Sequence, residues 1–364
     1  MSGIVRLAAG IEAELTKRLP RQRRTQRSKL ALLVATMLSA RSANLMDLAA
    51  ALPRPAERPD RRYQWIARLL ANPRVDCDAV MRPFAAEAVR HAGAAGGTVV
   101  LILDQSHISA RHQMLMLAVR VGERALPLAW RVRATQGAIG FAEQRELLTR
   151  VAAWLPAGGR VVPMGDRFDG TPDLIALCHA LGWDWRLRLK QDLLVFDVAG
   201  GETTLAECLA RGEHLLSGIE LTGKRVATHV AMVHEPGHPE PWIVALSAAP
   251  TVHRAFDYGL RWGIEAMFSD FKSRGFGLED SQIRHPERLA RLLLVMALAL
   301  HWAVSTGMWE AARQPLPAEK KAPEQRPKKL ARSRTSFFTR GLRRIQRFLT
   351  LLIPLPPLWS VWQN

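Results

Sequence analysis

The sequence predicts a protein of the mixed α/β class, in which a helical N-terminal region precedes a sheet-containing core. Three observations predict it. Helical periodicity punctuated by prolines fills residues 1–95, short β-rich runs alternate with helical patterns over 96–190, and further strand-like runs over 191–250 precede more helices. A chain of 364 residues with 48% hydrophobic content can bury a substantial core and is long enough for two or three domains.

The charge of the chain favours a polyanionic partner. Its 51 Lys and Arg residues against 33 Asp and Glu leave a formal net charge of +18, and its isoelectric point is near 11.0. Phosphates that bind such a surface release condensed counterions, which favours binding. Nucleic acid is therefore the leading candidate partner.

Cysteine usage and apolar patterning favour a cytoplasmic protein with no membrane partner. Cys77, Cys178 and Cys208 are odd in number and far apart, so they indicate neither a disulfide framework nor a cysteine-based zinc site. The longest apolar stretch, residues 292–300, is shorter than the roughly 20 residues of a membrane span and predicts a buried helix. The N-terminus lacks the pattern of a secretion signal.

Residues 1–95 are predicted to form a small helical domain. Prolines separate its predicted helices, which are Ile11–Leu19, Ser28–Ala40, Leu45–Leu52 and Tyr63–Leu70. The run from Lys17 to Lys29 holds seven cations and no acid, which predicts a surface that follows the phosphates of DNA. A solvated charged face is the alternative for such a run.

Residues 96–190 are predicted to form the first part of a sheet-containing core. The predicted strands are 98–104, 114–121, 125–132, 160–166 and 183–190, and the predicted helices are 141–155 and 172–181. The first three strands form a meander with a turn at Gly122–Glu123. Three strands, helix, strand, helix, strand is the order of the ribonuclease H-like fold, which is the fold we predict.

Three further regions complete the predicted organisation. Residues 191–250 are expected to be an inserted β subdomain, with strands at 193–198, 217–222, 226–233 and 241–247. Residues 251–312 complete the core with helices at 254–274 and 286–310. Residues 313–364 form a basic, Pro-rich tail, in which Glu319 to Arg347 hold eleven cations against two Glu. We expect this tail to be extended, apart from a helix over Ser336–Leu352.

Four polar side chains share one side of the predicted helix at 254–274. They are Tyr258, Arg261, Glu265 and Lys272. At about 100° per residue, these positions fall within an arc of roughly 60° on an α-helix. A carboxylate flanked by cations and a hydroxyl indicates a site for a metal ion and phosphates, and a solvated basic face is the alternative.

Two aspartates end strands of the predicted sheet. Asp104 ends the first strand and Asp166 the fourth. These strands are neighbours in a ribonuclease H-like sheet, so we expect the two carboxylates to lie together, joined by Glu265 from the later helix. Clustered carboxylates repel unless cations neutralise them, and oxygen ligands suit Mg²⁺ or Mn²⁺. A turn-capping role is the alternative for either aspartate alone.

Several segments of the chain carry a specific resemblance. They are LDQSHI at 103–108, QMLMLAVRVGERALPLAWRV at 113–132, GDRFDG at 165–170 and the series Tyr258, Arg261, Glu265 and Lys272. They resemble the DDE transposases of bacterial insertion sequences, in the family-four group with a Tyr-Arg-Glu-Lys (YREK) signature. The resemblance spans most of the chain and includes SARSANLMDLA at 39–49, YQWIARLLANPRVD at 63–76 and the β insertion.

The resemblance implies roles for individual residues. It implies that Asp104, Asp166 and Glu265 are the catalytic residues and the metal ligands, and that the other signature residues hold phosphates of the transposon end, namely Tyr258, Arg261 and Lys272. In relatives that cleave through a DNA hairpin, an aromatic residue of the insertion stacks on a flipped base, and Trp242 resembles that position. Such stacking supplies about 1–3 kcal/mol. A tryptophan packed within the insertion is the alternative.

The resemblance also implies an activity and partners. The chain would be a Mg²⁺-dependent transposase, with Mn²⁺ as a substitute, that acts by two-metal phosphodiester chemistry on the double-stranded DNA of inverted-repeat ends and of the target. The expected mode is cut-and-paste transposition by a homodimer in a synaptic complex, in the bacterial cytoplasm and associated with the nucleoid. A structure-selective nuclease of the same fold and a catalytically inactive DNA-binding relative are the alternatives.

Overall fold

The chain folds into a helical unit and a sheet unit. A computed structural model describes residues 2–55, 58–197, 199–234, 237, 240–314 and 335–355. The helical unit comprises residues 1–83 with 268–364, and the sheet unit comprises residues 84–267. The boundaries fall inside two helices, after Pro83 in α5 (Cys77–Ala92) and after Met267 in α10 (Gly263–Phe271). Segments from both ends of the sequence therefore belong to one unit.

The N-terminal helices of the helical unit confirm the sequence prediction. They are α1 (Gly3–Arg18), α2 (Arg24–Ala40), α3 (Leu45–Ala51) and α4 (Pro59–Ala71). Three of them, α1, α2 and α4, begin earlier than predicted, and α1 and α4 have favourable residues at their N-termini. The Ser2 hydroxyl accepts from the Val5 amide at the start of α1, and Pro59 occupies the first turn of α4, where its missing N–H costs nothing.

The long apolar helix α11 (Pro286–Arg313) is a core element of the helical unit. Its residues 292–300 are all buried, as predicted. Among the described residues it is the one helix long and apolar enough to cross a membrane, yet 89% of its most apolar window is buried inside the protein. Burial of that kind is typical of the core helix of a soluble protein. A short 3₁₀ turn, η3 (Leu278–Ser281), precedes α11.

Helix α13 (Phe337–Leu351) lies within the region predicted as a basic tail and confirms the helix predicted there. It packs along α11, with Phe338, Leu342 and Ile345 buried. Two glycines allow this packing, because a Cβ at Gly307 would lie 1.8 Å from the Phe337 carbonyl oxygen and one at Gly341 would lie 1.7 Å from that of Ala303. The rest of the segment predicted to be extended, residues 315–334 and 356–364, lies outside the described residues.

The sheet unit begins with the predicted meander. Its first five strands are β1 (Val99–Ser109), β2 (His112–Val121), β3 (Arg124–Arg133), β4 (Val161–Gly165) and β5 (Arg186–Arg188). Strands β1, β2 and β3 are antiparallel, whereas β4 runs parallel to β1 and β5 parallel to β4. Pro127 is tolerated because β3 is the edge of the sheet and because the pairing with β2 is irregular there, with Leu128 as the extra residue in β3. The 3₁₀ turn η1 (Ala94–Gly96) leads into β1.

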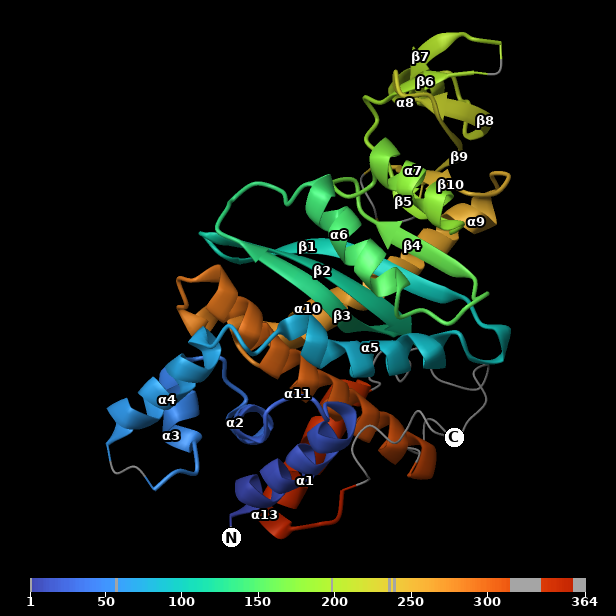
Figure 1. Ribbon diagram of the computed structural model, residues 1–364. Helices are drawn as coiled ribbons and strands as arrows, with labels where there is room; N and C mark the ends of the chain where they lie inside the picture. The colour runs from blue at the N-terminus through green and yellow to red at the C-terminus, as the bar shows by residue number, and fades with distance from the viewer. Residues whose placement is uncertain are drawn as a thin grey trace. The chain divides into compact units, whose positions relative to one another are not determined.

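The predicted insertion extends this sheet instead of forming a sheet of its own. Its elements are β6 (Leu194–Phe196), β7 (Glu202–Thr204), α8 (Leu205–Ala210), β8 (Leu215–Leu221), β9 (Val226–Val233) and β10 (Trp242–Leu246). Strand β10 pairs antiparallel with β5, so the order of the ten strands is β3-β2-β1-β4-β5-β10-β9-β8-β6-β7 (Figure 1). The short β5 would otherwise expose an unpaired edge, and β10 satisfies its backbone groups.

Helices and a 3₁₀ turn cover the sheet. Helix α6 (Phe141–Ala152) packs on β2 and β3, and α7 (Pro172–Leu181) lies beside α6 (Figure 1). After β10 come α9 (Val252–Phe256) and the 3₁₀ turn η2 (Asp257–Trp262), which packs against β4 and β5. The open mixed sheet with helices on it confirms the predicted α/β class.

The predicted single α-helix over 254–274 is wrong. The segment is helical but divides into α9, η2 and α10, so Tyr258 and Arg261 lie on a 3₁₀ turn and Lys272 follows the end of α10. The arc calculated for one α-helix therefore does not apply. Gly263, at the junction of η2 and α10, brings the chain so close to β3 that a Cβ there would lie 3.1 Å from the Arg124 carbonyl carbon. This close approach is tertiary and leaves no periodic signal.

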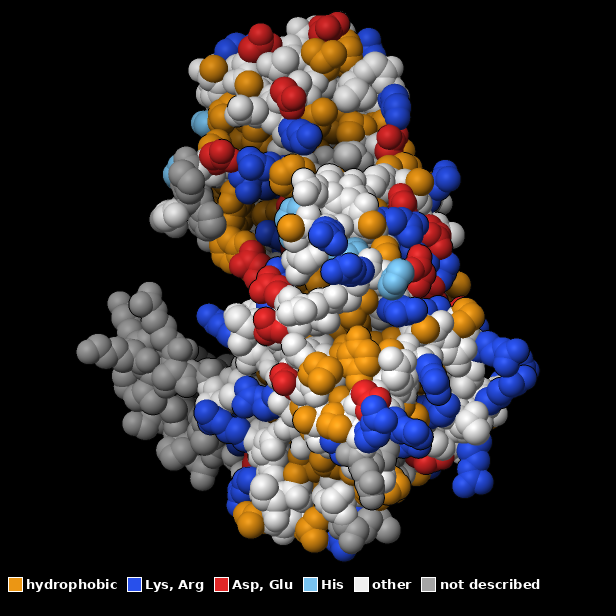
Figure 2. Space-filling model, turned by 90° about the vertical axis from the view of Figure 1, so that its left-hand side faces the viewer, with side chains coloured by type: hydrophobic (Ala, Val, Ile, Leu, Met, Phe, Trp, Pro, Cys, Tyr) orange, Lys and Arg blue, Asp and Glu red, His pale blue; other side chains and the backbone are white. Residues whose placement is uncertain are grey.

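Positive charge is distributed over the surface. On the face drawn in Figure 2, Lys and Arg side chains are spread over the molecule, with Asp and Glu among them. Part of the predicted basic run is used internally, since the Arg27 guanidinium donates to the carbonyl oxygen of Leu19 at 3.1 Å. Arg21, Arg23, Arg24 and Lys29 are exposed at the junction of α1 and α2. Together with Lys17, whose side chain is 72% exposed, they are the part of the run that faces solvent.

Candidate metal centre

The register of two parallel strands brings Asp104 and Asp166 together. Leu103 in β1 pairs with Gly165 in β4, and each aspartate is the residue that follows. The predicted neighbourhood of the two carboxylates is therefore confirmed. A third acid joins them, since ligand oxygens of Asp104, Asp166 and Asp169 all lie within 4.8 Å of one another. We call these three residues the acidic cluster.

The turn after β4 explains how Asp169 reaches the acidic cluster. The Asp166 carboxylate accepts from the amides of Phe168 at 2.8 Å and Asp169 at 3.2 Å, and the Gly170 amide donates to the Asp166 carbonyl oxygen at 2.6 Å. The turn lies tightly against β5, because a Cβ at Gly170 would be 1.9 Å from the Arg188 carbonyl oxygen. This geometry directs the Asp169 side chain inward instead of into solvent.

Asp169 is the acid that sequence reasoning missed. Its side chain is fully buried, and its Oδ1 accepts from Nε2 of Gln105 in β1 and from Nε2 of Gln144 in α6, both at 2.7 Å. Its Oδ2 is buried and has no hydrogen-bond partner in the described part of the chain. The sequence analysis did not place this aspartate in the site. An acid three residues after the strand-end aspartate, in GDRFDG, was the available signal.

Ionisation of the carboxyl groups in the acidic cluster costs free energy, because two of them are buried and all three lie close together. Burial raises the pKa of Asp104 to about 6, opposed by the attraction of Arg261 and reinforced by the charge of Asp166. Burial likewise raises the pKa of Asp169 to about 7, although the hydrogen bond from Gln105 opposes the rise. Carboxylates crowded in this way, with one buried oxygen lacking a donor, form a set of ligands that fits a divalent cation with oxygen preference.

Glu265 does not join the acidic cluster. Arg261 lies between them, because its Nη1 donates to Asp104 Oδ2 at 2.7 Å while its Nη2 is 3.6 Å from Glu265 Oε1. The Glu265 side chain is 61% exposed, whereas that of Arg261 is 12% exposed. The predicted convergence of three acids therefore holds for Asp104 and Asp166, and the third carboxylate in contact range is that of Asp169.

The side chain of Tyr258 is buried beside Arg261 and is not exposed at the surface of the site. Its side chain is 1% exposed, and its ring lies 5.6 Å from the guanidinium carbon of Arg261. Burial raises the pKa of its hydroxyl to about 12, so the group stays a neutral donor. This hydroxyl is buried and makes no hydrogen bond within the described residues. A phosphate contact by Tyr258 stays a prediction.

Trp242 offers no face to a nucleotide in this structure. It is 1% exposed and lies in β10, where its ring contacts those of Tyr258 and Trp262, each at 5.3 Å between centroids. The prediction that it stacks on a flipped base does not fit this burial, and the packed tryptophan is the alternative that does. Alternation along β10 could not reveal this, since all five of its residues are buried.

Lys272 belongs to the helical unit. Its Nζ lies 3.2 Å from Glu279 Oε1, and the lysine side chain is 24% exposed. The phosphate contact predicted for it stays a prediction.

A cationic hollow begins at the residue after Asp166. It has a volume of about 480 Å³, and its charged lining residues are Arg167, Arg188 and Lys190 with the acids Asp192 and Glu240. Glu240 Oε2 lies 3.0 Å from Nη1 of Arg167 and 3.5 Å from Nη2 of Arg188, so this carboxylate forms ion pairs with both arginines. Phe168 is 55% exposed, with the Arg167 guanidinium carbon 5.6 Å from its ring centre. Sequence reasoning did not assign these residues.

Comparison with known proteins leaves the family unassigned. No protein-family model matches the chain, and no curated protein matches it.

Proposed function

We propose that this chain is a Mg²⁺-dependent DNA transposase of the DDE type with a ribonuclease H-like core. The observation that carries the proposal is the acidic cluster, which lies where the parallel pairing of β1 and β4 ends. The strand order β3-β2-β1-β4-β5, with the first three antiparallel, supports the core assignment. The resemblance of the sequence segments around Asp104 and Asp166 to DDE transposases supplies the reaction class.

The acidic cluster would hold the metal. Asp104, Asp166 and Asp169 offer carboxylate oxygens within 4.8 Å of one another, and the Oδ2 of Asp169 has no donor in the described residues. When bound, Mg²⁺ or Mn²⁺ supplies activation of a water or 3′-hydroxyl and stabilisation of the leaving oxygen. Gln105 and Gln144 fix the orientation of Asp169, because both amides donate to its Oδ1.

Arg261 would orient two acids at once. Its guanidinium bonds Asp104 on one side and lies close to Glu265 on the other, so it sets the orientation of both carboxylates. Glu265, exposed beside this pair, is the acid that we propose completes the catalytic set. The buried hydroxyl of Tyr258 would remain a neutral donor over the whole physiological pH range.

Double-stranded DNA is the proposed partner. The net charge of +18 and the exposed cations at the α1–α2 junction support binding to inverted-repeat ends and to target DNA, and the cationic hollow beside Asp166 supports a phosphate path toward the acids. Synapsis of two ends would take a homodimer, in the cytoplasm and at the nucleoid.

The decisive experiment follows excision and joining. A supercoiled plasmid that carries the inverted repeats flanking this gene is incubated with the wild type and with Asp166→Asn, in Mg²⁺ and in Mn²⁺. We expect excision and joining by the wild type alone, with end binding retained by both. Cleavage without joining would indicate the structure-selective nuclease instead.

One observation favours a second candidate, the catalytically inactive DNA-binding relative. Arg261 neutralises Asp104 directly, and Glu265 lies outside the acidic cluster. If both metals and alternative ends give binding without any cleavage by the wild type, this second function is the correct one.

A further inference from the structure

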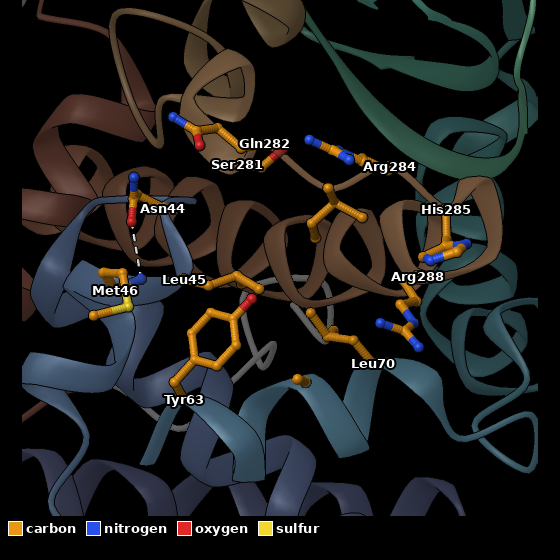
Figure 3. Close-up of a pocket in the computed structure, with 12 residues that line it drawn as sticks. Asn44, Leu45, Met46, Tyr63, Leu70, Ser281, Gln282, Arg284, His285 and Arg288 are labelled. Atoms are coloured by element: carbon orange, nitrogen blue, oxygen red, sulfur yellow. Dashed lines mark hydrogen bonds between the residues drawn. The ribbon is translucent and has the colours of Figure 1, made fainter. Parts of the chain in front are cut away.

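The helical unit contains a preformed cavity that shares no residue with the acidic cluster. It has a volume of about 460 Å³ and lies between α3, α4 and the segment that leads into α11 (Figure 3). Its lining residues are Asn44, Leu45, Met46, Tyr63, Ala67, Leu70, Ser281, Gln282, Ile283, Arg284, His285 and Arg288. None of them is acidic, and three are Arg or His. We call this the cationic cavity.

Hydrogen bonds between distant segments hold the walls of the cationic cavity together. The Asn44 side chain caps α3 through the Met46 amide and also donates from Nδ2 to the Asp280 carbonyl oxygen at 3.3 Å. Arg291 in α11 donates to the carbonyl oxygens of Leu70 at 3.0 Å and Val75 at 3.1 Å. Because these bonds tie both walls in place, little ordering of the protein would accompany binding.

The wall of the cavity that carries Arg and His side chains favours binding of an anion. His285 and Arg288 lie at the end of the cavity where α11 begins, and the Arg284 side chain extends from the preceding segment toward Ser281 (Figure 3). The side chain of Arg288 makes no hydrogen bond or ion pair within the described residues. The N-terminal end of a long helix adds its partial positive charge at the same place. An anionic group, and a phosphate above all, suits this wall.

The opposite wall is aromatic and apolar. Tyr63 extends from α4 with its ring beside Leu45 (Figure 3). Met46, which is 56% exposed, lies at the end of the cavity away from His285 and Arg288 (Figure 3). The half-buried tyrosine ring offers a flat surface on which a planar ring can stack, and the exposed methionine offers a polarisable thioether. Gln282 at the rim has a φ of 52°, a conformation that a non-glycine residue rarely adopts.

We propose that the cationic cavity binds a nucleotide, with the phosphate at Arg288 and the base on Tyr63. Its volume lies within the range of about 300–1,000 Å³ that small-ligand sites occupy. The lining supplies one charged end, one stacking face and polar groups at Ser281 and Gln282 for the edge of a base. The nucleotide has two sources, a free nucleoside monophosphate or a nucleotide within a single DNA strand.

Binding in the absence of divalent metal tests this site independently of catalysis. Calorimetry in EDTA measures the affinity of the full-length protein for deoxynucleoside monophosphates, for a short oligothymidylate and for inorganic phosphate. We expect Arg288→Gln to weaken nucleotide binding about tenfold, because a charge-assisted contact to phosphate is lost. Tyr63→Leu should weaken it about tenfold through lost stacking, while Tyr63→Phe retains wild-type affinity.

The matched control is Arg68→Gln, which removes the same charge from the exposed side of α4. Monophosphate binding that depends on Arg288 and Tyr63 assigns the site to a free nucleotide. Oligothymidylate binding alone, with the same dependence, assigns it to a DNA strand. The proposal is overturned if both cavity variants bind as Arg68→Gln does, or if inorganic phosphate binds as tightly as the nucleotides.

Discussion

The acidic cluster and the cationic cavity place opposite charges in opposite environments. The acidic cluster lies inside the sheet unit, where Asp169 is fully buried and Asp104 is 7% exposed, whereas the cations of the cavity are exposed. Burying like charges costs much free energy, and leaving cations in solvent costs little. In a chain with 51 Lys and Arg, exposed cations are common, so the buried acids are the more informative feature.

The two sites also differ in what holds them. Hydrogen bonds to single carboxylate oxygens fix the acidic cluster, so a change of one atom alters it. Helix packing and hydrogen bonds from side chains to main-chain carbonyl oxygens fix the cationic cavity, so its shape depends on the stability of the whole helical unit. The first site should therefore be sensitive to single-atom substitutions, and the second also to the stability of the helical unit.

The largest expected effect comes from single Asp→Asn substitutions in the segment that follows β4, compared by their rates of DNA cleavage. We expect Asp166→Asn to lower metal-dependent cleavage by about a thousandfold or more, since several kcal/mol of transition-state stabilisation depend on the metal. Asp169→Asn should lower it by about a hundredfold. Asp173→Asn, a surface acid 2.6 Å from Lys224, is the control and should cleave as the wild type does. Equal rates for Asp169→Asn and Asp173→Asn would remove Asp169 from the site.

Metal binding should stabilise the protein through the acidic cluster. At a Mg²⁺ concentration of 100 times Kd, we expect the free energy of unfolding to rise by about 2.7 kcal/mol. Thermal unfolding in Mg²⁺ and in EDTA measures the difference, which should vanish in Asp166→Asn. A rise of the same size in that variant would mean that the ion binds elsewhere.

The next expected effect is a loss of stability when a substitution disturbs the contact between α11 and α13. We expect Gly307→Ala to lower the free energy of unfolding by about 1–3 kcal/mol, because its Cβ would overlap the Phe337 carbonyl oxygen. Gly10→Ala makes the same chemical change in α1, where no atom lies within 4 Å, and should raise stability by about 0.5–1 kcal/mol. Chemical denaturation compares the two. Similar behaviour of both variants would contradict the tight crossing of the helices.

The smallest expected effect concerns the exposed cations at the α1–α2 junction. Arg23→Gln together with Arg24→Gln should reduce the salt dependence of DNA binding by about two phosphate contacts. Arg343→Gln together with Arg347→Gln, on the exposed side of α13, is the control. Titrations at several salt concentrations give both slopes, and equal reductions would show that the N-terminal run has no special role.

The sequence by itself determined the secondary structure and part of the site. Periodicity placed most of the helices and the meander, because helices and strands repeat locally. The adjacency of Asp104 and Asp166 also followed, since the predicted strand order makes their strands neighbours. The predicted end of the first strand at Asp104 was wrong, because β1 continues to Ser109 through its pairing with β2.

Tertiary structure decided the remaining features of the fold and the site. The burial of Asp169 depends on Gln105 and Gln144, which stand 64 and 25 residues earlier in the chain. The burial of Trp242 follows from packing among other aromatic side chains. The joining of β10 to β5 and the break before α10 likewise arise from contacts between distant segments. Such contacts leave no local pattern, because only close packing of the folded chain brings the partners together.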